Sequence, residues 1–121
     1  MPTKNLNRDE IQQIANGHYE PIRQGLINEA IDTLNAGRVI SKNNLAGFVQ
    51  YLNQLLQGTS VTTLDLHDND IAQHAPQLAA SLRGTNVSTL GLRYNMIARH
   101  APQLAANLRG TSVTTLDLGY N

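Results

Sequence analysis

The stretch TLDLHDNDI, residues 63–71, holds the densest group of side chains that could carry out chemistry. Asp65, His67, Asp68 and Asp70 lie within six positions of one another. Carboxylate and imidazole groups are common ligands of divalent cations, so this group could form an acidic metal-binding loop of an enzyme. The same residues could instead fill the exposed positions of a repeated structural unit. The rest of the chain decides between these interpretations.

The chain repeats itself at a regular spacing. Residues 61–86 and 87–112 are identical at 18 of 26 positions, and a third copy begins at Val113. Such self-similarity is the sequence signature of a repeat architecture, in which each copy is one structural unit. The spacing therefore favours a scaffold made of stacked units.

The acidic residues of this stretch lie at positions that change between the copies, where the second copy has Gly91, Tyr94 and Met96. Alternation along a strand would also point neighbouring side chains to opposite faces. We therefore predict no metal site and no cofactor. The chain also lacks the short motifs of nucleophilic, phosphate-binding and zinc-dependent sites, so we predict that the protein is not an enzyme.

Each copy combines a segment of period two with a segment of helical period. TLDLHDN alternates apolar and polar residues, which predicts a short strand. In HAPQLAASLR the apolar residues recur at i, i+3, i+4 and i+7, which predicts a helix with one buried face. Pro76 suits the first turn of that helix, and Gly84 suits the position just past its end.

Two less regular segments precede the clear copies. Ile40 and Asn43 precede Leu66 and Asn69 by the same spacing that separates the clear copies, so we expect residues 35–60 to be a degenerate first unit. The segment before it does not fit the repeat, and we expect its apolar stripes to form helices that cap the open end of the array. We predict four parallel strands near 38–41, 63–67, 89–93 and 115–118, and helices near 8–16, 21–35, 44–57, 74–83 and 100–109.

The consensus V-x-T-L-x-L-x-x-N-x-I-A-x-H-A-P-Q-L-A-A-x-L-R resembles the leucine-rich repeat, and its length and helix are similar to the ribonuclease-inhibitor-like branch of that family. That branch includes cytosolic receptors and many bacterial proteins, some of them effectors delivered into host cells. The resemblance implies an α/β solenoid, a right-handed βα superhelix with its parallel sheet on the concave face. It divides the chain, packed as a single domain, into an N-terminal helical cap at 1–34 and leucine-rich repeats at 35–60, 61–86, 87–112 and, in part, 113–121.

The resemblance also implies roles for individual residues. In this family the repeated asparagine binds backbone groups where the chain leaves the strand, which would make three residues structural: Asn69, Asn95 and Asn121. The family turns its exposed strand positions toward the concave surface, and two tyrosines flank that surface here. Because Tyr and Arg are frequent binding hot spots, we expect a partner protein to bind seven residues: Asp65, His67, Asp68, Arg93, Tyr94, Asp117 and Tyr120.

The expected function is a non-catalytic protein–protein interaction module with an unknown protein as its partner, either a bacterial effector or a fragment of one. The alternative is a structural fragment or an engineered scaffold with no dedicated partner. The third copy stops after its strand, so we expect an exposed apolar edge, which indicates either a homodimer through residues 113–121 or a chain cut from a longer array. Three residues are expected to mediate self-association: Val113, Leu116 and Leu118.

Composition argues against other classes of partner. Lys+Arg and Asp+Glu are 9 each, so the formal net charge is zero. The strongly basic balance typical of nucleic-acid binding is absent, and we expect no such partner. No run of about 18 apolar residues occurs, so we expect no membrane partner. The chain has no Cys, which fits a reducing compartment. We expect a cytoplasmic protein, or one delivered into a host cell by a signal that the sequence does not reveal.

Overall fold

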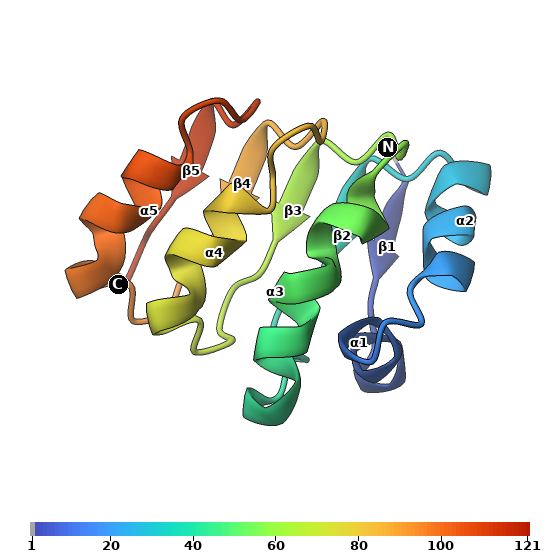
Figure 1. Ribbon diagram of the computed structural model, residues 1–121, viewed down its shortest axis with the longest axis horizontal. Helices are drawn as coiled ribbons and strands as arrows, with labels where there is room; N and C mark the ends of the chain where they lie inside the picture. Colours follow the sequence, from blue (N-terminus) through green and yellow to red (C-terminus); the bar gives the residue numbers. More distant parts are fainter. Residues whose placement is uncertain (1) are drawn as a thin grey trace.

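A computed structural model describes residues 2–121 as an α/β fold with one parallel sheet (Figure 1). The strands lie side by side in the order in which they occur along the chain. They are β1 (Thr3–Asn5), β2 (Thr33–Asn35), β3 (Thr63–Asp65), β4 (Thr89–Gly91) and β5 (Thr115–Asp117). A repeat-like alternation of strand and helix therefore runs through the described chain.

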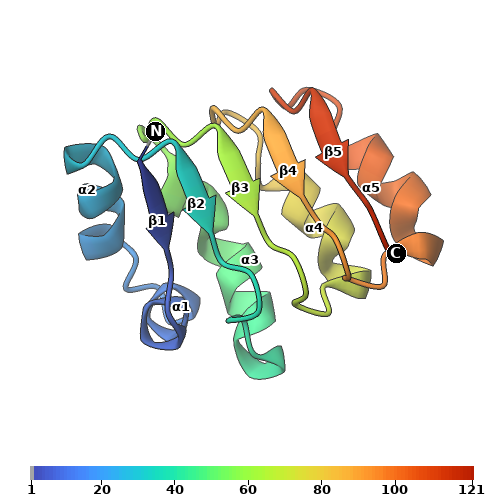
Figure 2. The same ribbon diagram turned by 180° about the vertical axis from the view of Figure 1, so that it is seen from behind.

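The helices line one face of this sheet (Figure 1), and the view from behind shows the strands in front of them (Figure 2). They are α1 (Arg8–Ala15), α2 (Glu20–Asn28), α3 (Lys42–Leu56), α4 (Ala75–Ala80) and α5 (Ala101–Asn107). Short 3-10 turns at Ala72–His74 and Ala98–His100 lead into α4 and α5. No helix within residues 2–121 is both long enough and apolar enough to cross a membrane.

The strand predicted at 38–41 is wrong, because β2 lies earlier in the chain. Leu34 pairs with Leu64 across the sheet, so the step between these strands is longer than the step from Leu64 to Leu90. The longer step accommodates α3, which has 15 residues. Residues 38–41 form the loop after β2 instead, where Arg38 has a φ of 66°.

The sheet has five strands rather than the four predicted, because the sequence analysis did not predict β1. Lys4 stands at its centre, where the other strands have leucine, and its ammonium group lies 2.9 Å from the carboxylate of Glu10 on α1. A short strand without an apolar residue leaves no periodic signal. The segment expected to be a helical cap thus contributes a strand to the sheet as well as two helices.

The predicted helices differ from the observed ones mainly at their ends. The helices predicted near 8–16 and 44–57 are confirmed as α1 and α3. The helix predicted over 21–35 is too long, because α2 ends at Asn28 and Ala30 has a left-handed φ of 50°. There the backbone N–H of Ile31 binds the carbonyl of Leu26, which closes the helix before β2 begins.

A single apolar core joins the strands to the helices. The two leucines of each clear copy are fully buried, and the isoleucine that follows them is buried as well. These residues are Leu64, Leu66 and Ile71, and Leu90, Leu92 and Ile97. Parallel pairing of β3, β4 and β5 is also confirmed.

Candidate functional site

In β3 and β4 the central residue is buried and the residues on either side of it are only partly buried. No helix of residues 2–121 covers the face of the sheet opposite the helical layer, which we call the open face (Figure 2). One row of it consists entirely of threonine: Thr3, Thr33, Thr63, Thr89 and Thr115. The next row changes along the sheet and contains Asn5, Asn35, Asp65, Gly91 and Asp117. The threonine row is the same in every strand, whereas the variable row contains the carboxylates and amides that distinguish one strand from the next.

A polar residue at the end of three strands caps the backbone N–H two residues later, a contact typical of Asx turns. The pairs are Asn35 with Gly37 at 2.9 Å, Asp65 with His67 at 3.1 Å, and Asp117 with Gly119 at 3.0 Å. Strand β4 ends in Gly91, which has no side chain to make this contact. The open face is therefore bare backbone between the carboxylates of Asp65 and Asp117.

The side chains of His67 and Arg93 point away from Gly91 of β4 in opposite directions along the sheet. The ring of His67 lies against Gly37, where an added methyl group would overlap it, and its Nδ1 is 2.9 Å from Asp65 Oδ1. Arg93 instead lies beside Gly119 and donates from Nε to Asp117 Oδ2 at 2.6 Å. The result is a depression of about 370 Å³ over Gly91.

The Arg93–Asp117 contact stabilises both charged forms. The backbone N–H of Gly119 and the guanidinium of Arg93 hold the pKa of the Asp117 carboxyl below its usual value. The hydrogen bond to Asp117 raises the pKa of Arg93. The pair is thus ionised at neutral pH, and the positive charge of Arg93 is already compensated within the chain.

A second depression, of about 350 Å³, adjoins the strand ends of the clear copies. The rings of Tyr94 and Tyr120 stack there with centroids 4.7 Å apart and planes 2° apart. Tyr94, Met96 and Tyr120 are exposed by 49%, 70% and 73%, and they are the large apolar residues exposed within the described chain. Asp68 and Asp70 complete the lining. Exposed apolar side chains gathered at one place are typical of interaction surfaces.

Asp70 and Met96 belong to this surface, although the sequence prediction of partner-binding residues left them out. Their signal was the change from aspartate to methionine at one position of two nearly identical copies. The seven predicted residues line the two depressions. Their carboxylates contact different side chains, since Asp65 contacts the ring of His67 and Asp68 Oδ2 lies 3.4 Å from Arg38 Nε.

The repeated asparagines bind backbone groups of their own unit, just after the strand, and of the preceding unit. Asn95 Oδ1 accepts the backbone N–H groups of Asn69 and Ile71 at 2.8 and 3.2 Å, and its Nδ2 donates to the carbonyls of Leu66 and Arg93. Asn121 makes the same contacts one unit later, and Asn69 binds the loop after β2. Because these side chains satisfy backbone groups that the strands leave unpaired, we interpret them as structural.

The residues predicted to self-associate lie on the last strand of the sheet and beside it. Val113, Leu116 and Leu118 are partly buried, whereas their counterparts one unit earlier are fully buried. Those counterparts are Val87, Leu90 and Leu92. Part of the apolar surface of these residues therefore remains accessible in the 121-residue chain.

Comparison with known proteins adds no relative to this picture. No family model, curated protein or solved structure matches the chain. The function is therefore inferred from the residues and their geometry.

Proposed function

We propose that this protein is a non-catalytic protein–protein interaction module, built as a short leucine-rich-repeat solenoid that binds its partner through the open face of its sheet. The in-register strands, the helices on one side and the asparagine contacts between units support the repeat assignment. The functional proposal rests on one observation. Four of the eight positions that differ between the two nearly identical copies line two adjoining depressions. Their residues are Asp65, His67, Asp68 and Asp70, with the counterparts Gly91, Arg93, Tyr94 and Met96.

These residues suit recognition better than stability. The core leucines and the asparagines are occupied with packing and backbone hydrogen bonds. Arg93 and Tyr94 are exposed at the junction of the two depressions, and Arg and Tyr are enriched among residues that dominate binding energy. A partner that covered both depressions would bury them together.

Affinity capture from a cell extract, with quantitative comparison of variants, tests the proposal. The chain and an Arg93→Ala/Tyr94→Ala double variant serve as baits, and Gln103→Ala/Arg109→Ala is the matched control because both of its residues are exposed on or just after α5. We expect the chain and the control to recover the same partner and the open-face variant to lose it. Equal recovery by the open-face variant, or no partner at all, would contradict the proposal.

A structural fragment or engineered scaffold that self-associates through β5 is the alternative. It is favoured by the incomplete burial of Leu116 and Leu118 on the last strand of the sheet and just after it. Exposed strand edges pair readily with other chains, and a two-fold axis could join two such strands antiparallel. Sedimentation of the chain against Leu118→Lys tests this. Association that the substitution abolishes would support the alternative, and a monomer in both cases would contradict it.

A further inference from the structure

The surface formed by Asp68, Asp70, Tyr94, Met96 and Tyr120, which we call the tyrosine platform, has a defined geometry. Asp68 and Tyr94 occupy equivalent positions in successive units, because the backbone N–H of each binds the carbonyl two residues past the end of the next strand. Aspartate is much shorter than tyrosine. The face of the Tyr94 ring that looks toward Asp68 is therefore not covered in the way that Tyr120 covers the opposite face.

The carboxylates beside this ring are incompletely neutralised. Asp70 makes no hydrogen bond or ion pair with any residue that the structure describes. Asp68 has one cationic neighbour, Arg38, and both side chains are more than half exposed. Arg93 is held by Asp117, and Arg99 borders the adjoining depression beside Asp70 without an ion pair to it. The platform thus combines an accessible ring face with a carboxylate, that of Asp70, that has no ion-pair partner within the described residues.

A guanidinium group matches these features better than other side chains do. It is planar, so it stacks on the face of a tyrosine ring, and its forked donors can bind a carboxylate at two points. The exposed thioether of Met96 can pack against the methylene stem of the same side chain. An ammonium group supplies charge without a flat face, and a neutral amide supplies a flat face without charge.

We propose that the tyrosine platform receives an arginine side chain from a basic segment of the partner protein, stacked on Tyr94 and bound to Asp70. This inference rests on the proposed function, since it names the partner chemistry of the same surface. The contact between Arg38 and Asp68 shows the same pairing made within the chain. Charge complementarity at Asp70 selects a basic side chain, because this carboxylate makes no ion pair within residues 2–121, whereas Asp68 already faces Arg38.

Titration of the isotope-labelled protein with short peptides, followed by amide NMR shifts, tests the proposal. The probes are acetyl-Gly-Ser-Arg-Ser-Gly-amide and the same peptide with citrulline or lysine in place of arginine. We expect the arginine peptide to shift the amides of the platform residues and to bind about tenfold more tightly than either of the others. Equal binding by the citrulline or lysine peptide, or shifts confined to other residues, would overturn the proposal.

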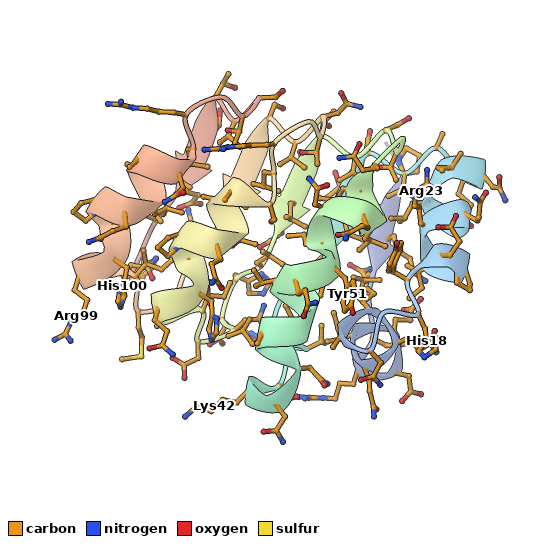
Figure 3. The ribbon with its side chains drawn as sticks, viewed as in Figure 1. His18, Arg23, Lys42, Tyr51, Arg99 and His100 are labelled. Atoms are coloured by element: carbon orange, nitrogen blue, oxygen red, sulfur yellow. The ribbon has the colours of Figure 1, made fainter. Side chains whose placement is uncertain are left out.

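Variants separate the platform from aromatic residues in general. We expect Tyr120→Leu and Asp70→Asn each to weaken binding of the arginine peptide by about threefold to tenfold. The matched control is Tyr19→Leu, because Tyr19 stacks on Tyr51 with ring centroids 5.9 Å apart. Tyr51 lies on α3, on the side of the molecule that carries the N-terminal helices (Figure 3). An unchanged affinity in Asp70→Asn, which keeps the rings intact, would overturn the proposal even if Tyr120→Leu perturbed the fold.

The two proposals fail differently. If a partner is captured through Arg93 and Tyr94 but the arginine peptide does not bind, the open face still recognises a protein and the arginine inference is overturned. If the arginine peptide binds the platform but the open-face variant recovers the captured proteins as well as the unchanged chain does, the platform stands as an arginine-binding site. The proposed function then loses its surface.

Discussion

The N-terminal and C-terminal halves of the sheet reach the same register by different routes. Thr3, Thr33 and Thr63 pair in succession, and so do Thr63, Thr89 and Thr115, but the steps of the first series are longer. The difference between the units on either side of β3 lies in the helical layer, since α3 has 15 residues and α4 has 6. Backbone hydrogen bonds fix the strands at about 4.8 Å from one another, so length varies where no ladder constrains it.

The open faces of the halves differ even more than their lengths. The N-terminal half presents uncharged residues in its variable row, Asn5 and Asn35, followed by Gly37. The C-terminal half presents carboxylates, an imidazole, a guanidinium and two stacked tyrosines. Under the proposed function, the N-terminal half is mainly scaffold. Recognition is concentrated in the C-terminal half, which consists of the nearly identical copies.

Truncation of the largest buried side chain of the first half should have the largest effect. Phe48 on α3 is fully buried in the core that both halves share. We expect Phe48→Ala to lower the free energy of unfolding by about 3–5 kcal/mol. Circular dichroism during urea denaturation should show one transition for the whole chain. Two separate transitions would break the comparison, because the halves would then be independent folding units.

Leucine in the second half should behave similarly. Leu92 is fully buried after β4, and we expect Leu92→Ala to cost about 2–5 kcal/mol. A neutral result in the same urea titration would show that the position does not face the core.

The asparagines sharpen the comparison, since the two halves use this residue differently. Asn95 is fully buried and binds four backbone groups, whereas Asn43, which the spacing of the clear copies would align with it, is exposed on α3. We expect Asn95→Leu to cost about 1–3 kcal/mol through unsatisfied groups. The control Asn43→Leu should change stability by less than about 0.5 kcal/mol. Equal effects would mean that both positions carry the same role.

The smallest expected effect concerns acid. The folded pKa of Asp117 lies below its unfolded value, which is near 3.8. The native state therefore gains stability from this group above that pH and loses it as the pH falls through the folded pKa. Thermal denaturation from pH 6 to pH 2 should show a slightly steeper loss for the chain than for Asp117→Asn. A steeper loss in the variant would contradict the assigned sign.

Part of the fold follows from local pattern because the clear copies obey it. The strands predicted near 63–67, 89–93 and 115–118 are present as β3, β4 and β5, and they pair in parallel. The strands of the first half were not predicted correctly, because its units are longer and β1 has Lys4 where the other strands have leucine. Extending the spacing of the clear copies backwards put Ile40 opposite Leu66, but pairing in the sheet puts Leu34 opposite Leu64.

The sequence by itself determined which residues vary and which face the core, since these depend on short spacings repeated in register, while the role of the asparagines was implied by the resemblance to a known repeat. Tertiary structure alone decided the longer steps before β2 and β3, the pairing of β1 and the direction in which His67 and Arg93 lean. These features depend on hydrogen bonds and contacts between units, such as the space above Gly37 and Gly119, which no local pattern encodes. The stacked tyrosines arose in the same way, because only adjacent units bring Tyr94 and Tyr120 together.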